Sequence, residues 1–343
     1  MNIVVTILVT ILIFGVLIFI HELGHFLVAK ACKVKVNEFA MGMGPTLIKW
    51  QGKETKYALR ALPIGGFVSM EGEDESSGEK NAFCNKPVWQ RMLVIITGPL
   101  MNLLLGFLIL VVVVCMTPLN GSNVIARFND NAVSNQSGLQ VGDEILSING
   151  TSILVDNDII YALLRAEGGI ADFDVLRDGE KVHLEDVRFN VTEVDGTPQI
   201  DIDFKVQAIE KDFFSVIKMA FNKTLSYGRS IWVTFIDMLT GNVGINELSG
   251  PIGAGQVIGQ TISLGLASVL NIAAFISINV GIFNLIPFPA LDGWRFFVLI
   301  FEGIRKKTFN RKYEAVINLV GLGLLMALML FVSFNDVFKL FNG

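Results

Sequence analysis

Four long stretches of the chain are almost free of charged side chains. The first runs from Ile3 to Ala29 and the second from Met92 to Leu119. The third covers Leu248 to Leu291, inside which we place a helix at about residues 267–287, and the fourth runs from Ala315 to Asn335. A transmembrane helix needs about 20 consecutive apolar residues. The pattern therefore predicts four membrane-spanning helices.

The segment between the first two stretches has the pattern of strands. Two short runs suited to strands, Val34–Met41 and Lys56–Leu62, are each followed by glycines and prolines. We expect a hairpin or small sheet against the membrane, whose edge is able to pair with an extended substrate. A plain cytoplasmic loop fits the pattern equally well. Residues 71–81 form a polar, acidic loop.

The long segment after the second apolar stretch is polar and has the pattern of a folded domain outside the membrane. Residues 120–210 alternate in the manner of strands and contain many turn residues, so we expect a separate folded insert. Within it, His183 is expected to be an ordinary surface residue. Residues 213–239 place apolar side chains at helical spacing among lysines and an arginine, which predicts a helix lying in the membrane interface.

Composition and charge support a membrane protein and give it an orientation. Of 343 residues, 52% are hydrophobic and only 17% charged, and the mean hydropathy is +0.57, which excludes an ordinary soluble domain. Lys30, Lys33 and Lys35 follow the first stretch, and five basic residues lie within 305–312. By the positive-inside rule both segments are cytoplasmic, which places both termini and the insert outside the cytoplasm. Three cysteines without a C-x-x-C pair suggest neither a disulfide framework nor a cysteine zinc site.

The first stretch contains ionisable residues that are costly in a membrane. His21 and His25 lie four apart, so on a helix they share one face, with Glu22 beside them. This is the H-E-x-x-H pattern, in which the histidines bind Zn²⁺ and the glutamate acts as general base. The alternative is that the two histidines only cap the cytoplasmic end of an anchor. We prefer the metal site, because two of the three histidines fall at this spacing.

A catalytic zinc also needs a third protein ligand. Asp292 follows Pro287 and Pro289 at the end of the third stretch, where a regular helix cannot continue. The alternative is a turn aspartate at the membrane surface, a common use of Asp-Gly. The charge rule places Asp292 on the same side as His21 and His25, and no other predicted span has a comparable acidic residue. We therefore expect Asp292 to be the third ligand.

Four motifs together resemble a known family. They are H-E-L-G-H at 21–25, G-P-x-x-N at 98–102, a PDZ-like run at 137–150 and N-x-x-P-x-x-x-L-D-G at 284–293. In this order they resemble the site-2 proteases, the intramembrane zinc metalloproteases, in their bacterial PDZ-containing branch. Trp294 stands where family members commonly have a second glycine.

The resemblance implies roles for these residues and a class of substrate. It implies His21, His25 and Asp292 as zinc ligands, Glu22 as the catalytic base, and supporting positions near the substrate for Asn102, Asn284 and Gly293. It also implies regulated intramembrane proteolysis in a bacterial cell membrane. The expected substrates are pre-trimmed single-span membrane proteins, among them anti-sigma factors and remnant signal peptides, and no nucleic acid is expected as a partner.

The expected fold class is a polytopic α-helical membrane protein with four transmembrane helices, a membrane-associated β-hairpin or sheet, and one inserted extracytoplasmic PDZ (α+β) domain. Its expected parts are the first helix at 1–33, the β region and acidic loop at 34–85, the second helix at 86–119, the PDZ-like domain at 120–210, amphipathic interfacial helices at 211–247, a re-entrant segment with the third helix at 248–300, and a basic loop with the fourth helix at 301–343.

Two other classes of protein are weighed against the protease. A zinc-binding scaffold that captures partners through the PDZ-like module needs no base beside its metal and commonly has four protein ligands, whereas Glu22 is present here. A transporter is expected to show internal repeats and charges in several spans, which this sequence lacks.

Overall fold

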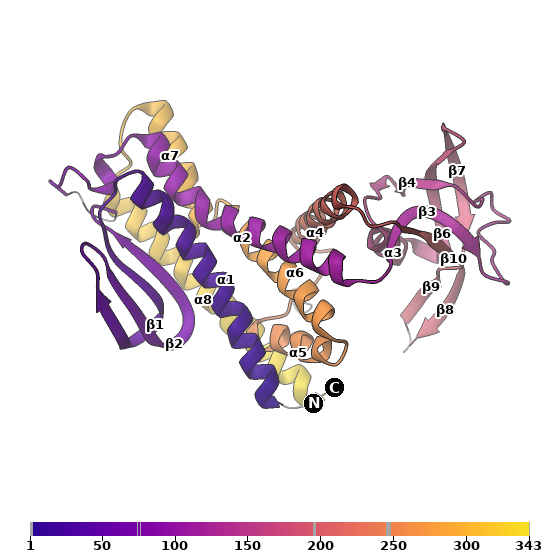
Figure 1. Ribbon diagram of the computed structural model, residues 1–343, viewed down its shortest axis with the longest axis horizontal. Helices are drawn as coiled ribbons and strands as arrows, with labels where there is room; N and C mark the ends of the chain where they lie inside the picture. Colours follow the sequence, from indigo (N-terminus) through magenta and orange to yellow (C-terminus); the bar gives the residue numbers. More distant parts are fainter. Residues whose placement is uncertain (1–2, 74, 76, 195–196, 245–247, 343) are drawn as a thin grey trace. The chain divides into compact units, whose positions relative to one another are not determined.

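A computed structural model describes residues 3–73, 75, 77–194, 197–244 and 248–342, and these residues form two compact units. One unit combines residues 1–109 with 230–343, and the other covers residues 110–229. Figure 1 labels the helices and strands.

The prediction of four long apolar helices is confirmed. They are α1 (Ile3–Ala31), α2 (Val88–Met116), α6 (Leu266–Leu285) and α8 (Arg311–Asn342), and each is long and apolar enough to cross a membrane. Large apolar side chains such as Leu8 on α1 and Leu330 on α8 are more than 60% exposed, which suits a hydrocarbon environment and not water. The helix α2 runs through Pro99 without interruption.

The predicted strands of residues 34–70 are present, but their predicted ends were wrong. Strand β1 covers Val36–Gln51 and β2 covers Lys56–Met70, so both continue through the glycines and prolines that we expected to end them. Gly42, Gly44 and Gly65 adopt positive φ angles of 73° to 84°, and the pairing shifts register repeatedly along the strands. Glycine permits such bulges, so the two strands bend where they were expected to stop.

The bending turns two strands into a sheet of four segments. Residues 46–51 pair with 56–60, residues 56–59 also pair with 38–41, and residues 36–41 pair with 66–70. The segment 66–70 therefore lies at an edge of this sheet, with a paired neighbour on one side only among the described residues. A small hydrophobic core, which includes Ala29, Val36, Val68 and Val94, packs this sheet against α1 and α2.

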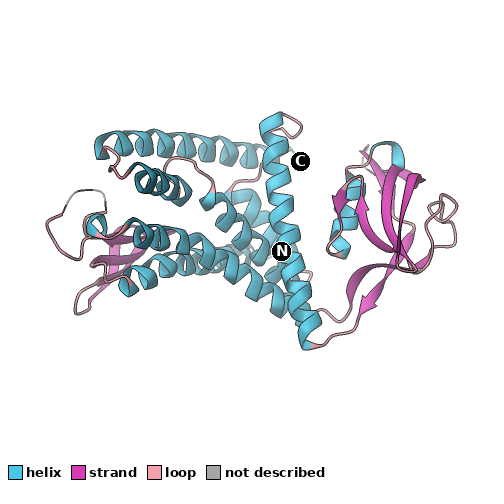
Figure 2. Cartoon of the chain, turned by 90° about the horizontal axis from the view of Figure 1, so that it is seen from above, coloured by secondary structure: helices cyan, strands magenta, loops and turns pink. Residues whose placement is uncertain are grey.

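The second unit is built on an antiparallel sheet that packs against a helix (Figure 2). Its strands follow the order β10-β3-β4-β6-β7, with β5 paired to β4, and β8 pairs separately with β9. His183 is exposed and forms an ion pair with Asp174, as expected of a surface residue. The elements are β3 (Asn120–Phe128), β4 (Glu144–Ile148), β5 (Thr151–Ser152), α3 (Asp156–Leu164), η2 (Glu167–Gly169), β6 (Ile170–Arg177), β7 (Glu180–Arg188), β8 (Asn190–Val194), β9 (Thr197–Asp201) and β10 (Phe204–Ile209).

The remaining elements of the described residues are η1 (Phe83–Asn85), α4 (Phe213–Thr240), α5 (Pro251–Ile262) and α7 (Asp292–Arg305). The helix α5 lies where a re-entrant segment was expected. The buried Asp336 of α8 accepts hydrogen bonds from the backbone N–H groups of Gly250 and Gly253, each at 2.9 Å, and so fixes the start of α5. The helix α7 is joined to α2 by a buried ion pair between Arg91 and Glu302 at 2.9 Å.

Candidate metal centre and active site

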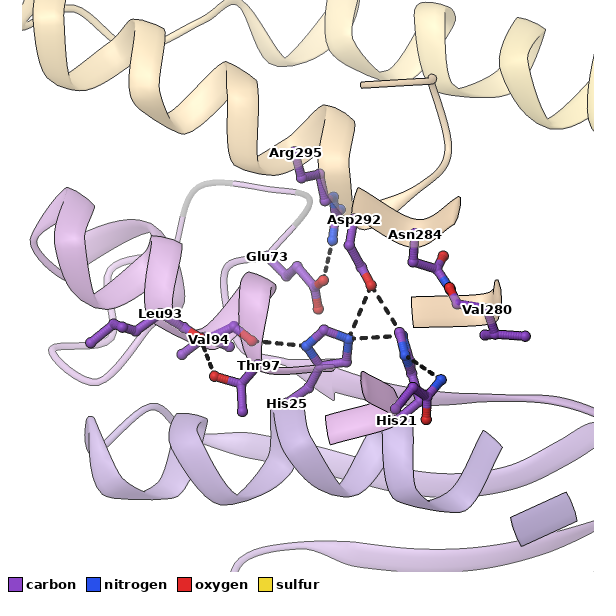
Figure 3. A network of polar contacts seen from close by, with 11 residues as sticks. His21, His25, Glu73, Leu93, Val94, Thr97, Val280, Asn284, Asp292 and Arg295 are labelled. Atoms are coloured by element: carbon purple, nitrogen blue, oxygen red, sulfur yellow. Dashed lines mark hydrogen bonds and ion pairs between the residues drawn. The ribbon is translucent and has the colours of Figure 1, made fainter. Parts of the chain in front are cut away.

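The three residues expected to bind metal, His21, His25 and Asp292, lie together in the structure. Asp292 follows His25 by 267 positions in the sequence (292 − 25). His21 and His25 lie one turn apart on α1, and Asp292 is the first residue of α7. His21 Nε2 is 3.2 Å from His25 Nε2 and 3.0 Å from Asp292 Oδ2, and His25 Nε2 is 3.4 Å from the same oxygen (Figure 3).

The donor set fits a zinc ion. Zinc bonds of about 2.0–2.1 Å at tetrahedral angles place neighbouring ligand atoms about 3.3 Å apart. The three sides of the observed triangle, 3.0, 3.2 and 3.4 Å, surround this value. The Asp292 oxygen is buried and lacks a hydrogen-bond partner among the described residues. Three atoms with lone pairs so close together repel one another unless a cation lies between them.

The ionisation of Asp292 also suits a ligand. Burial by itself raises the pKa of this carboxyl, but the protonated forms of His25 and His21 outweigh burial and lower the pKa below its usual range, an effect that a cation held by the neutral imidazoles would also have. A carboxylate that stays ionised is the form that coordinates a metal.

Two glycines allow α1 and α2 to approach closely enough to form this site. A Cβ added to Gly98 of α2 would lie 2.2 Å from His25 Nε2, and one added to Gly24 of α1 would lie 2.7 Å from the carbonyl oxygen of Thr97. His25 Nδ1 lies 2.8 Å from the carbonyl oxygen of Val94, a buried contact in which the ring N–H donates. This bond leaves Nε2 of His25 free for a metal.

Glu22 lies in the same cavity as the three converging residues. This cavity of about 160 Å³ is lined by His21, Glu22, His25 and Asp292, and also by the edge segment 66–70. Gly66 of that segment is close to Glu22, since a Cβ there would lie 2.9 Å from Glu22 Cγ. A polypeptide backbone without a side chain thus lies next to the expected base.

Two charged residues of the cavity wall were not predicted. Glu73 and Arg295 form an ion pair and both line the cavity (Figure 3). Arg295 lies three residues after Asp292 on α7, so helical spacing alone could have drawn attention to it. Glu73 was one of several acidic residues in a polar loop, and the sequence contained no signal that distinguished it.

The three expected supporting residues lie in different surroundings. Asn102 is fully buried, and its side-chain amide lies 3.4 Å from His21 Nδ1. Asn284 donates its amide hydrogen bond to the carbonyl of Val280 in its own helix. Gly293 is buried where a Cβ would lie 2.3 Å from the carbonyl oxygen of Ile286, so its place in the motif is explained by the close packing of α7 on the end of α6.

These observations define a class of protein. A membrane protein with four long apolar helices among its described residues brings two imidazoles and a carboxylate together at zinc-like distances, with the carboxylates of Glu22 and Glu73 in the same cavity. Three protein ligands with a free coordination position characterise catalytic zinc sites, whereas structural sites commonly have four protein ligands. The class is that of membrane-embedded metal-dependent hydrolases.

Comparison with known proteins identifies the family. The model of peptidase family M50 matches residues 9–328, and the chain belongs to this family, whose members are zinc metalloproteases. A zinc metalloprotease of Clostridium acetobutylicum is 36% identical over 339 residues, which cover 96% of this chain and 97% of the relative. The regulator of sigma-W protease RasP of Bacillus subtilis is 30% identical over 418 aligned positions, covering 98% of this chain and 99% of the relative. The chain is an intramembrane zinc metalloprotease of a bacterial membrane.

Proposed function

We propose that this protease hydrolyses a peptide bond within or near the membrane span of pre-trimmed single-span proteins. In this proposal His21, His25 and Asp292 hold the zinc ion and Glu22 is the catalytic base. The observation that carries the proposal is the convergence of the three ligand atoms within 3.4 Å of one another in a cavity that Glu22 also lines.

The chemistry divides between the metal and Glu22. Zinc, when bound, supplies Lewis acidity that makes a water molecule acidic near neutral pH and polarises the carbonyl of the substrate. The Glu22 carboxylate takes the proton of the attacking water and returns it to the leaving nitrogen. The two histidines and Asp292 hold their ligand atoms in place. The cation of Arg295 offsets part of the negative charge that Glu22, Glu73 and Asp292 bring to the cavity.

A substrate helix must unwind before its peptide bonds become accessible, because its carbonyls are hydrogen-bonded within the helix. The edge segment 66–70 has a paired strand on one side only among the described residues, and it lines the same cavity as Glu22. An extended substrate strand that pairs with this edge would present its backbone to the cavity. We propose that Asn102, Asn284 and Gly293 support the substrate from the helical side.

The remaining parts of the proposal concern access and substrate. The insert at 120–210 is proposed to be an extracytoplasmic PDZ domain that admits substrates already shortened by another protease, while the active site faces the cytoplasmic side. The name of the Bacillus subtilis relative refers to the regulation of sigma-W. We propose anti-sigma factors and remnant signal peptides as substrates of this chain on that basis and on the family resemblance.

The proposal is tested with the full chain purified in mild detergent. Zinc content is measured by elemental analysis for the wild type, Asp292→Ala and Glu22→Gln, and cleavage of a single-span reporter is measured in parallel. We expect about one zinc per wild-type chain, as a mononuclear site requires, loss of zinc in Asp292→Ala, and retained zinc without cleavage in Glu22→Gln. Tight zinc binding by Asp292→Ala would refute the ligand set and favour the scaffold alternative.

A further inference from the structure

In a zinc site, the ring nitrogen of each histidine that does not bind the metal also needs a hydrogen-bond partner. An imidazole that binds a metal through Nε2 carries its proton on Nδ1, and this N–H needs an acceptor that holds the ring in place. For His25 the acceptor is the carbonyl oxygen of Val94 at 2.8 Å. For His21 the polar atom nearest to Nδ1, among the contacts that the structure describes, belongs to the side-chain amide of Asn102 at 3.4 Å.

In the side-chain amide of Asn102, the nitrogen contacts His21, whereas the oxygen has no hydrogen-bond partner among the described residues. Its Nδ2 faces His21 Nδ1, while its Oδ1 is buried and makes no hydrogen bond with any described residue. With Nδ2 facing the ring, Nδ1 must accept, so the imidazole proton moves to Nε2, the atom that points at Asp292. That tautomer cannot bind zinc. A buried amide oxygen without a partner also costs about 1–3 kcal/mol.

One rotation restores the zinc-binding tautomer and gives the oxygen a partner, while the NH2 group takes the buried place that the oxygen leaves. The oxygen and nitrogen of an asparagine amide exchange places by a 180° turn, and the two orientations have nearly the same shape. After the turn, Oδ1 faces Nδ1, accepts its proton in a hydrogen bond and thereby gains a partner. Nε2 of His21 then has a free lone pair, as Nε2 of His25 has.

We infer that Asn102 is a positioning residue of the metal centre: its Oδ1 accepts the hydrogen bond of His21 Nδ1–H and selects the zinc-binding tautomer. The inference rests on the ligand set of the proposed function. It gives Asn102 a role through His21, where the proposal above has it support the substrate.

The surroundings of Asn102 suit an orienting role. The residue is fully buried on α2. Its backbone carbonyl accepts a hydrogen bond from the buried Ser277 hydroxyl of α6 at 2.7 Å. The acceptors for both histidines thus lie on α2, which Gly24 and Gly98 allow to pack closely against α1. A residue that holds a metal-binding histidine in one orientation must itself be held rigidly.

Two substitutions separate the orienting role from a substrate-holding role. Asn102→Leu keeps the size of the side chain and removes the acceptor, whereas Asn102→Asp keeps an acceptor and cannot donate. Zinc affinity of the purified full chain is measured by competition with a chelator of known affinity. We expect a loss of about 10–100-fold in Asn102→Leu, the usual effect of removing such a partner of a metal ligand. In Asn102→Asp we expect affinity equal to or tighter than wild type.

Other results would overturn the inference. Wild-type zinc affinity in Asn102→Leu, with a raised KM for the reporter, would show that Asn102 holds substrate. Equal weakening in the Leu and Asp variants would show that it acts only through packing. If Asn102→Leu does not fold, the Asp variant decides alone, since a tenfold loss of zinc affinity there contradicts the inference. Asp292→Ala is measured beside them, because its retention of zinc would mark failure of the proposed ligand set itself.

Discussion

Gly98 is the position where the smallest change is expected to have the largest effect on the metal centre. In Gly98→Ala the new Cβ would lie 2.2 Å from His25 Nε2, whereas ordinary contact begins at 3.4 Å, so the ring must move by about 1.2 Å (3.4 − 2.2). Metal–ligand distances tolerate deviations of about 0.2 Å. The displaced nitrogen therefore no longer serves as a ligand.

The neighbouring structure prevents an easy adjustment of the helices. At Gly24 a Cβ would lie only 2.7 Å from Thr97 O, so the two helix backbones are already in close contact beside Gly98. A shift of the ring also breaks its hydrogen bond to Val94, worth about 0.5–1.5 kcal/mol. We expect zinc affinity to fall by at least about 100-fold, which corresponds to about 2.7 kcal/mol, and cleavage of the reporter to be lost with it.

The assay is chelator competition on the detergent-purified full chain, with Gly15→Ala as the matched control. Gly15 lies on α1, and a Cβ there meets no atom within 4 Å. The control is expected to bind zinc and cleave the reporter as the wild type does. If Gly98→Ala keeps wild-type zinc affinity and activity, His25 is not held where the structure places it, and the argument from close packing is wrong.

Three further outcomes are expected. Gly66→Ala pushes against Glu22, which is not a ligand, so the cleavage rate should fall while zinc content stays at the wild-type level; loss of zinc would contradict this division of roles. Arg91→Leu leaves the carboxylate of Glu302 buried without its ion-pair partner, which costs about 3–5 kcal/mol, and the double replacement by leucine should recover part of the melting temperature; equal melting of single and double variants would argue against the pair. In the hairpin, burial raises the pKa of Glu38, but hydrogen bonds from two basic neighbours outweigh it and hold the pKa below its usual value. The stabilisation from this carboxylate is therefore present at neutral pH and lost as the pH falls through the lowered pKa, so hydrogen exchange of the hairpin should be faster in Glu38→Gln than in the wild type at neutral pH, and this difference should disappear as the pH falls through the lowered pKa; an equal difference in acid would contradict the argument.

Local patterns in the sequence were sufficient for the helices and for the identity of the chemical groups. Long charge-free stretches predicted the four apolar helices because the length and apolarity needed to cross a membrane are properties of contiguous residues. The four-residue spacing of His21 and His25 placed them on one helical face for the same reason. Asp292 was selected from its chemistry and because no other predicted span contained a comparable acidic residue, and the structure places it beside both histidines, whereas the buried Asp336 of α8 lies just beyond the predicted fourth span.

Strand ends were harder to predict than helices. The glycines and prolines of residues 42–66 indicated turns, yet in the structure they bend two long strands into a four-segment sheet. Whether a glycine ends a strand or forms a bulge depends on the partner strand, which a local pattern does not specify. The edge segment 66–70 and its place beside Glu22 followed only from that pairing.

Local sequence patterns were enough to predict which residues bind zinc, which helices are apolar enough for a membrane, and which carboxylate is the proposed base. The packed structure was needed to show that Gly98 must lack a side chain, that Val94 and Asn102 face the two imidazoles, and that Glu73 pairs with Arg295. These features depend on contacts between residues far apart in the chain. Their distances are fixed by how α1, α2 and α7 pack, and packing is a property of the whole fold.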